Sequence, residues 1–274
     1  MRGNVLWGVV ALLLALSVAA SAGASDKANS LYTVDLASGQ LRRIGVIGDG
    51  TPIVGLAISE AGPSSLYALT ADSRLWQFTP FAPSKILAEV EISRLAAGER
   101  LVGIDVRPAT NQLFGISDAS TIYIVDPESG AATAIGEPFS PIIDGNLLGF
   151  DFNPTVDRIR VVDDAGQNLR LNPETGLIGS NPDTGAPTID GFAAYASTDT
   201  SAGARPTLSG AGYTNSVAGA ESTQLYVIDT AQDVLAIQDP PNEGVLWTVG
   251  SLGADLDGPV GFDIAASGLA YAAR

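Results

Sequence analysis

The sequence predicts an all-β fold: a β-propeller of five four-stranded blades, closed by pairing of the N- and C-terminal strands. Short segments in which apolar and polar residues alternate recur along the chain, and no helical periodicity separates them. Four such segments fall in each interval of about 50 residues, which is typical of propeller blades. The first and last units are incomplete in complementary ways, which predicts the closure.

The clearest unit occupies residues 148–176. Ile159 and Val161 alternate with polar residues, as do Leu169 and Leu171, with the two-residue period of a strand. The segment DDAGQN between these strands is rich in residues that favour a chain reversal. Pro154 ends the preceding strand because proline cannot donate to a ladder. The unit therefore contains three consecutive strands.

The same pattern recurs in the other units. Each first strand opens with a glycine followed by apolar residues: Gly55, Gly103, Gly149, Gly212 and Gly261. The last unit, residues 260–272, has only a first and a second strand, whereas the chain after residue 30 begins with a third strand at 31–34 and a fourth at 41–47. We expect these halves to pair as one blade, which closes the ring and hides the strand edges.

Three turns share one pattern, in which Asp or Asn is followed four residues later by glycine: Asp35 to Gly39, Asp126 to Gly130, and Asn172 to Gly176. The Asp or Asn side chain caps such a turn and the glycine takes its left-handed position, so these acids are interpreted as structural. Residues 179–211 do not fit the repeat. They are predicted to be an insertion or long loop, a place where propellers often carry function.

Residues 1–24 have the pattern of a secretory signal peptide. An apolar run from Val5 to Ala20 follows Arg2, and the small residues at Ala22 and Ala24 fit a cleavage site. An uncleaved anchor is the alternative, although about sixteen apolar residues are short for a span that needs roughly twenty. We expect a secreted or periplasmic monomer in which residues 25–274 form a single propeller domain, with no membrane span after cleavage.

The composition excludes several classes of function. The net charge of −16 opposes approach to phosphate, so nucleic acids and anionic membranes are not expected partners. The absence of histidine removes Ser-His-Asp catalysis and histidine-ligated zinc. The chain also has no cysteine, so the fold does not depend on disulfides.

The run from Phe152-Asn153-Pro154 through RIRVVDDAGQNLRLNPETG, with the later LYVID and GFDI segments, resembles family 4394 of bacterial domains of unknown function. The similarity extends from about Leu31 to Ala272. It implies a propeller-like fold and an exported protein. It implies no activity and no catalytic residues, because none is established for the family.

The unit at residues 148–176 carries an unusual pair of arginines. Arg160 takes a position in the second strand that is aromatic in three other units: Tyr67, Phe114 and Tyr226. Arg170 is matched in the third strand with further aromatic residues: Tyr32, Trp76 and Tyr123. The two arginines share one face of a hairpin, so they would repel each other unless a carboxylate lies beside them.

Two interpretations of this face remain open. One is a structural charge network, in which Asp151 on the neighbouring strand neutralises the arginines, because buried arginines are normally paired. The other is a ligand site, in which guanidinium groups bind the carboxylates or hydroxyls of an anion or a sugar. The candidate ligand-binding residues are Asp151, Asn153, Arg158, Arg160, Asn168 and Arg170.

No cofactor is expected, and calcium is the one alternative. Residues 181–185 and the pair Asp163-Asp164 supply hard oxygen ligands, but neither completes a calcium-binding loop with its terminal glutamate. Asp105, Asp151 and Asp263 lie in the middle of first strands, which are innermost in a propeller. There they either line the channel or accept hydrogen bonds between blades.

These observations favour a non-catalytic binding module for an extracellular protein partner or a glycan, since no paired-acid motif stands out. One alternative is a carboxylate-dependent glycan hydrolase, which can work without histidine through two acids about 5 to 10 Å apart. The other alternative is a structural surface protein. Binding and hydrolysis are separated by whether two carboxylates converge in a concave pocket.

Overall fold

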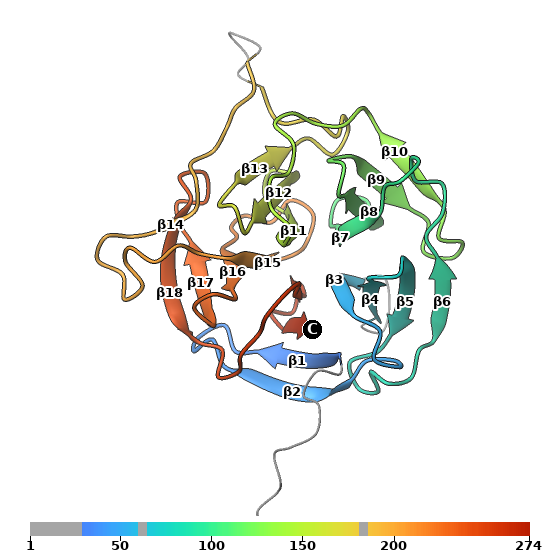
Figure 1. Cartoon of the computed structure of the whole chain (residues 1–274), viewed down its shortest axis with the longest axis horizontal. Coiled ribbons are helices and arrows are strands. Elements are labelled where there is room, and N and C mark those ends of the chain that lie inside the picture. The colour runs from blue at the N-terminus through green and yellow to red at the C-terminus, as the bar shows by residue number, and fades with distance from the viewer. Residues whose placement is uncertain (1–28, 60–64, 181–185) are drawn as a thin grey trace, which may run out of the picture.

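The computed structural model describes residues 29–59, 65–180 and 186–274, and the predicted signal peptide, residues 1–24, lies outside them. The described residues form five β-sheets around a central axis (Figure 1). The predicted fold class, a five-bladed β-propeller, is confirmed. None of the described residues belongs to a helix long and apolar enough to cross a membrane.

The blades follow one another along the chain. Blade 1 contains β3 (Ile53–Ser59), β4 (Ser65–Thr70), β5 (Arg74–Phe78) and β6 (Ala88–Glu91). Blade 2 contains β7 (Leu101–Arg107), β8 (Gln112–Ser117), β9 (Ile122–Val125) and β10 (Ala132–Ile135). Blade 3 contains β11 (Leu148–Asn153), β12 (Arg158–Asp163) and β13 (Asn168–Leu171). Blade 4 contains β15 (Leu208–Tyr213), β16 (Leu225–Asp229), β17 (Val234–Gln238), β18 (Val245–Ser251) and the short β14 (Ala194–Tyr195).

Blade 5 is built from both ends of the described chain, as predicted. Its strands are β19 (Gly261–Ile264), β20 (Ala270–Ala273), β1 (Ser30–Val34) and β2 (Leu41–Val46). β1 pairs with β20 from Leu31 opposite Ala273 to Val34 opposite Ala270. Figure 1 shows the blue β1 and β2 beside the red C-terminal end of the chain. The ring is thereby closed through backbone hydrogen bonds rather than through a covalent link.

Blade 3 departs from the four-stranded pattern. The predicted fourth strand near Ile178 is reduced to one isolated bridge with Leu171. The inserted segment instead supplies β14, which pairs parallel to β18 as an extra outer strand of blade 4. The predicted insertion, residues 179–211, also ends earlier than expected, because residues 208–211 already belong to β15.

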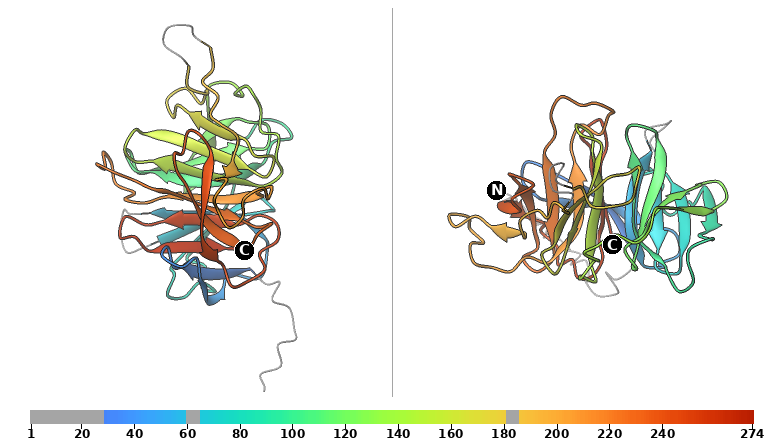
Figure 2. Two further views of the ribbon diagram at one scale, coloured as in Figure 1. Left: turned by 90° about the vertical axis from the view of Figure 1, so that its left-hand side faces the viewer. Right: turned by 90° about the horizontal axis from the view of Figure 1, so that it is seen from above.

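The hydrophobic core lies between neighbouring blades, whose sheets pack face to face around the ring (Figure 2). One cluster joins blades 2 and 3 and includes Phe114, Phe150 and Phe152. The rings of Phe114 and Phe152 meet edge to face, with centroids 5.0 Å apart. Because each sheet presents apolar residues on both of its faces, every blade depends on two neighbours.

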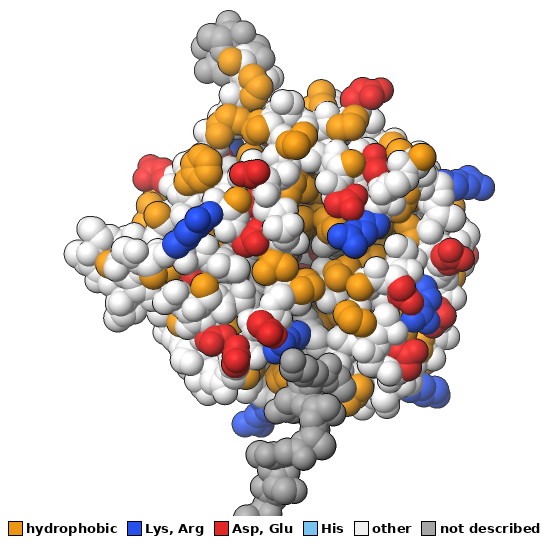
Figure 3. Space-filling model, viewed as in Figure 1, with side chains coloured by type: hydrophobic (Ala, Val, Ile, Leu, Met, Phe, Trp, Pro, Cys, Tyr) orange, Lys and Arg blue, Asp and Glu red, His pale blue; other side chains and the backbone are white. Residues whose placement is uncertain are grey.

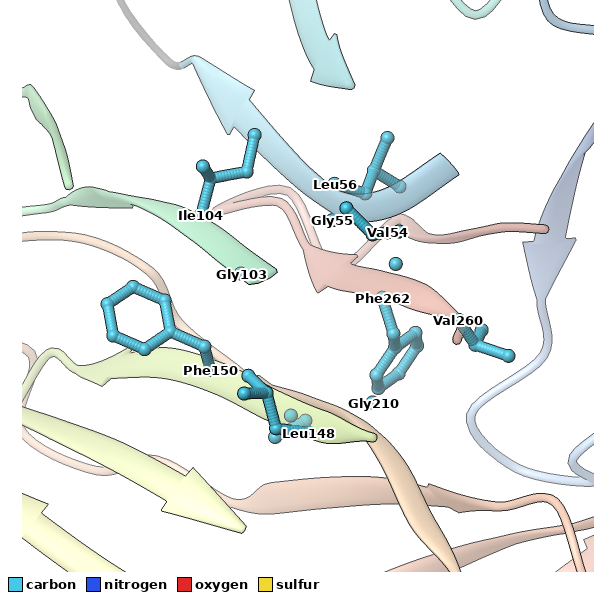
Figure 4. Close-up of a pocket in the computed structure, with 13 residues that line it drawn as sticks. Val54, Gly55, Leu56, Gly103, Ile104, Leu148, Phe150, Gly210, Val260 and Phe262 are labelled. Carbon is cyan, nitrogen blue, oxygen red and sulfur yellow. The ribbon is translucent and has the colours of Figure 1, made fainter. Parts of the chain in front are cut away.

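The inner strands approach one another through glycines at the centre of the ring (Figure 4). A Cβ atom added to Gly149 would lie 2.5 Å from the backbone nitrogen of Ala211, and one added to Gly261 would lie 2.6 Å from that of Leu56. The glycine of blade 4 that lines this centre is Gly210, so the expectation of Gly212 is two residues out of register. The remaining space is about 10 Å³, which closes the centre to anything larger than water.

The three repeated turns have the predicted geometry. The side-chain oxygens of Asp35, Asp126 and Asn172 each accept a hydrogen bond from the backbone nitrogen two residues later. The glycines that follow have φ angles between 69° and 80°, in the left-handed region. Gly130 and Gly176 also press against backbone carbonyls of the preceding blade. These acids are structural, because their side chains fix turns on which neighbouring blades pack.

Candidate functional site

A groove lies between blades 3 and 4, at the end of the ring formed by the β11–β12 and β15–β16 connections. It consists of two cavities that share Asn153, Tyr213 and Pro241. The first, the arginine cavity, has a volume of about 170 Å³ and is also lined by Arg158, Arg160, Arg170 and Asn242. The second, the acidic cavity, has a volume of about 390 Å³ and is also lined by Glu221, Thr223, Gln224, Gln238 and Asp239. The two together have the size of an ordinary small-ligand site.

Arg160 forms the buried floor of the arginine cavity. It is 2% exposed, and its Nη1 donates hydrogen bonds to Asp190 Oδ2 at 2.7 Å and to Asn168 Oδ1 at 2.6 Å. Its Nη2 donates to Asn242 Oδ1 at 2.8 Å, and its Nε donates to the Tyr213 hydroxyl at 3.3 Å. Arg160 therefore ties β12 to the inserted segment and to blade 4, and little of its donor capacity remains for a ligand.

Asp190 is the carboxylate that lies between the two arginines. Arg170 donates through Nε and Nη2 to its two oxygens, at 2.7 and 2.8 Å, in a bidentate pair. Arg160 lies opposite both Asp151 and Arg170 in the strand pairing, as predicted. The expectation that Asp151 neutralises the arginines is wrong, because its carboxylate accepts a hydrogen bond from the Tyr213 backbone nitrogen instead. Asp190 comes from the insertion, whose position no repeat pattern could indicate.

The position assigned to Arg170 also needs correction. In the strand pairing Arg170 lies opposite Arg160, and the corresponding residue opposite Tyr67 is Gln77. The residue opposite Phe114 is Ile124. The comparison of Arg170 with Tyr123 and Trp76 is therefore one residue out of register. The comparison of Arg160 with Tyr67 and Phe114 is correct, because these residues lie at equivalent positions of their blades.

Asn168 and Gln238 extend the buried network from blade 3 into blade 4. The Gln238 Nε2 donates to Asn168 Oδ1 and to the Pro241 carbonyl, and the Asn168 Nδ2 donates to the Gly191 and Pro241 carbonyls. The Gln238 Oε1 atom is buried and accepts no hydrogen bond from the described residues. A buried carbonyl without a donor is costly, so Gln238 leaves one acceptor at the wall of the acidic cavity to be satisfied.

The polar groups still free in the arginine cavity are nitrogen donors. Within the described part of the chain, no carboxylate pairs with Arg158, which donates only Nη1, to two backbone carbonyls. Among the described residues, no partner bonds to Nη1 of Arg170 or to the Nδ2 groups of Asn153 and Asn242. The Oδ1 of Asn153 already accepts from the backbone N–H and the hydroxyl of Thr155, and that of Asn242 from Arg160. This end of the groove can therefore donate hydrogen bonds but accept few.

The free groups of the acidic cavity are hydrogen-bond acceptors rather than donors. Glu221 and Asp239 are exposed, and within residues 29–59, 65–180 and 186–274 their carboxylates have no ion-pair or hydrogen-bond partner. Together with Gln238 Oε1, they make this end of the groove rich in acceptors. The groove thus has a donor end and an acceptor end on one continuous surface.

A second cluster of acids lies at the centre of the ring, away from the groove. Oxygens of Asp105, Asp151 and Asp263 all lie within 4.8 Å of one another, and each residue is no more than 5% exposed. Burial first, and then the charge of the neighbouring carboxylates, raise the pKa of Asp105 and of Asp151 well above its usual range. These are the described acids that converge as a potential hard-cation ligand set, and all three are buried.

These central carboxylates accept hydrogen bonds between neighbouring blades, which is one of the two roles that the sequence suggested for them. Asp105 accepts from the Phe152 backbone nitrogen at 2.8 Å, and Asp263 accepts from that of Ile58 at 2.6 Å. With Asp151 and Tyr213, three of the five blade interfaces carry such a bond. The first-strand acids are structural in this respect.

The Asp163-Asp164 pair, considered for calcium, is already engaged with backbone nitrogens. Asp163 accepts from Gly145, Ala165 and Gln167, and Asp164 accepts from Asn146 and Leu147. A calcium ion would have to displace these hydrogen bonds. The other calcium candidate, residues 181–185, lies outside the described residues.

Four of the six candidate ligand-binding residues line the arginine cavity: Asn153, Arg158, Arg160 and Arg170. The remaining two do not, because Asp151 faces the centre of the ring and Asn168 is buried and fully bonded. The sequence reasoning missed Asp190, Asn242, Gln238, Glu221 and Asp239. A signal for Gln238 existed, since it takes a strand position that is Phe78 in blade 1 and Val125 in blade 2.

Comparisons with known proteins place the chain in a family without an assigned activity. The sequence profile of the family described as "Domain of unknown function (DUF4394)" matches residues 74–274. No curated protein matches the chain in sequence.

The chain is also similar to solved structures. It resembles a structural genomics protein of unknown function from Bacteroides thetaiotaomicron, with 14% identity, a TM-score of 0.47, and coverage of 90% of this chain and 76% of that one. It resembles the Neurospora crassa Pan2 WD40 domain, with 11% identity, a TM-score of 0.41, and coverage of 90% and 69%. A third is YCF48 bound to D1 peptide, with 14% identity, a TM-score of 0.39 and coverage of 81%, and the chain spans 60% of that protein's length.

Proposed function

The chain belongs to the DUF4394 family, and we propose that it is an exported, non-catalytic module that binds an extracellular protein partner or a glycan in the groove between blades 3 and 4. One observation carries the proposal. The groove presents the charged groups of Arg158, Glu221 and Asp239, which have no ion-pair partner among the described residues, on a wall held in place by the buried Arg160–Asp190 pair. A fixed wall with unsatisfied polar groups is the arrangement that binds ligands without paying for reorganisation.

The glycan hydrolase is the second candidate, because Glu221 and Asp239 line one cavity. A general acid for glycoside cleavage is normally enclosed so that its pKa rises, whereas both of these residues are exposed to water. The three central carboxylates are enclosed, but each is no more than 5% exposed, which leaves no surface for a sugar ring to contact. The structural surface protein, the third possibility, gives no reason for the unsatisfied groups in the groove.

A binding screen tests the proposal. Residues 25–274 are screened by thermal shift against a glycan panel and a metabolite and peptide panel. Any ligand of the groove should be lost in Ser222→Trp, which fills the acidic cavity from its exposed rim, and retained in Ala119→Trp, an exposed position in the β8–β9 turn. Absence of ligands in every panel, or binding that survives Ser222→Trp, would count against the proposal. Cleavage of a glycan that is lost in Glu221→Gln would support the hydrolase instead.

Export and independence from metals are parts of the same proposal. We propose that residues 1–24 are removed on export and that binding needs no cofactor, calcium included. Mass spectrometry of the exported protein should find an N-terminus after Ala22 or Ala24, and an intact Met1 would contradict cleavage. Chelation with EDTA should leave ligand binding unchanged.

A further inference from the structure

We propose that the groove binds the carboxyl terminus of a peptide that carries a lysine or arginine beside its terminal carboxylate. This inference rests on the proposed function and specifies the ligand of the same site. The terminal carboxylate is assigned to the arginine cavity, and the basic side chain to the acidic cavity.

The arginine cavity selects a group that only accepts hydrogen bonds. The polar atoms that have no partner among the described residues are N–H donors on Arg158, Arg170, Asn153 and Asn242, while the side-chain carbonyl oxygens of this cavity already accept from internal donors. A hydroxyl or an amide would leave its own hydrogens without an acceptor there. A carboxylate leaves none, and planar guanidinium groups bind it with matched geometry.

The acidic cavity selects a group that donates. Glu221 and Asp239 bring two charges that no described cation neutralises, and Gln238 brings a buried carbonyl that no described donor reaches. The Gln238 side chain is 1% exposed, so its unsatisfied oxygen is an observation independent of the two exposed acids. An ammonium or guanidinium group satisfies the acids, and the partial negative charge of the unsatisfied Gln238 carbonyl adds to the attraction for a cation at this wall.

The charge of the whole molecule favours a ligand that carries both signs. At a net charge of −16, long-range repulsion opposes a polyanion, such as a chain of acidic sugars. A carboxylate with a basic neighbour is neutral in sum and is not repelled. The charge pattern of the groove then sets its orientation.

The lining of the groove favours a peptide over an acidic sugar. Tyr213 is the one aromatic residue among the described residues that line the two cavities, and it is 1% exposed. Its ring is covered, so it presents no face on which a sugar could stack. A peptide terminus needs no such face, because its carboxylate and backbone supply the polar contacts.

The test uses residues 25–274 and the peptide N-acetyl-Gly-Ser-Gly-Lys-Ala, with a free carboxylate, in isothermal titration calorimetry. We expect binding that weakens at least tenfold when the peptide is amidated at its terminus, and also when its lysine is replaced by glutamine. Arg158→Gln should remove the difference between the free and amidated peptides. The double variant Glu221→Gln and Asp239→Asn should remove the difference between lysine and glutamine.

The matched control is Arg205→Gln, an exposed arginine that lines neither cavity, which should bind as the unmodified chain does. Melting temperatures identify any variant that fails to fold. Equal affinity for the free and amidated peptides, or no binding of either, would overturn the inference. If glucuronate or another acidic monosaccharide binds in an Arg158-dependent manner while the peptides do not, the peptide inference fails and the proposed function stands. If no ligand binds in the groove, both fail.

Discussion

Asp190 is the residue on which the wall of the groove depends. It accepts hydrogen bonds from both Arg160 and Arg170, and it is the one carboxylate among the described residues that pairs with the buried Arg160. An unpaired guanidinium at 2% exposure would be strongly unfavourable. The contact between the insertion and blade 3 therefore includes a buried ion pair in addition to hydrogen bonds such as that from Asn168 Nδ2 to the Gly191 carbonyl.

We expect Asp190→Ala to lower the free energy of unfolding by about 3 to 5 kcal/mol, because it strands a buried charge. Chemical denaturation measures this change. The control is Asp118→Ala, which removes the partner of Arg100 in an exposed ion pair and should cost less than about 1 kcal/mol. A similar small cost for both variants would mean that water replaces Asp190 as the partner of Arg160.

The central carboxylates should make stability depend on pH. Burial and mutual repulsion raise the pKa of Asp105 and Asp151, so these carboxyls hold their protons more tightly in the folded than in the unfolded chain. The stabilisation they contribute is then complete below the unfolded pKa of about 3.9, and is lost as the pH rises through the raised folded values. Their contribution opposes that of the exposed turn aspartate Asp126, whose pKa is lowered by hydrogen bonds from Ser129 and the Glu128 backbone.

We expect Asp151→Asn to raise the free energy of unfolding at pH 7, because it removes a buried carboxylate that two neighbouring carboxylates repel. Asparagine keeps an oxygen for the Tyr213 backbone N–H and removes one charge from the cluster. The gain should shrink toward pH 4, and urea unfolding at several pH values measures it. Asp126→Asn, the control, should give no gain at pH 7. A loss of stability in Asp151→Asn that is the same at pH 4 and pH 7 would contradict the repulsion between these acids.

The inner strands owe their spacing to glycine. Gly149→Ala would bring a Cβ atom to 2.5 Å from the backbone of Ala211, and backbone cannot rotate away as a side chain can. We expect a cost of about 3 kcal/mol, the upper part of the range for overpacking. Gly179→Ala is the control, since its Cβ would meet its nearest neighbour, the Arg170 carbonyl, at 3.9 Å and its φ is not positive. Thermal melting compares the two, and equal melting temperatures would contradict close packing at the centre.

The strands could be predicted because each follows a two-residue period of apolar residues. The alignment of equivalent residues between blades could not be predicted where a strand contains several small residues. In β15, Gly210 and Gly212 are two residues apart and therefore lie on the same face of the strand. The sequence alone does not say which of them packs at the centre of the ring. The turn motifs were predictable because capping and a left-handed glycine are local properties. Asp190 was not, because it lies in an inserted segment whose register is set only by contacts with β13 and blade 4.

The sequence also could not show which residues of the two cavities lie together in the groove. Arg160 was identifiable because it interrupts a repeat of aromatic residues, whereas Glu221 lies in the β15–β16 loop, outside the repeated strands. Whether an acid in a loop meets an arginine on a strand depends on the closure of the ring. That information is spread over the whole chain.

Because β1 pairs with β20 and closes the ring, we expect the propeller to unfold as one cooperative unit. Deleting residues 260–274 removes β19 and β20 and exposes one edge of β1. We expect this truncation to lose cooperative thermal unfolding, while deletion of Arg274 alone, whose backbone bonds only to Ser30, should retain it. Circular dichroism during heating distinguishes the two. A sharp melting transition in the long truncation would show that four blades fold without the fifth.

The aspartate bridges near the axis are unevenly distributed. They join blade 2 to blade 3, blade 3 to blade 4, and blade 5 to blade 1. In blades 1 and 4 the equivalent positions are Ala57 and Gly212, which have no carboxylate. At these two interfaces the backbone N–H of Val106 bonds to the side chain of the preceding residue, Asp105, and that of Ile264 bonds to Asp263. The ring thus consists of two arcs, one of three blades and one of two, that meet at two seams without such a hydrogen bond. The smaller arc contains both chain ends, and the proposed binding groove lies inside the larger arc. A strain that opens a seam would therefore leave the ligand's two contact surfaces together.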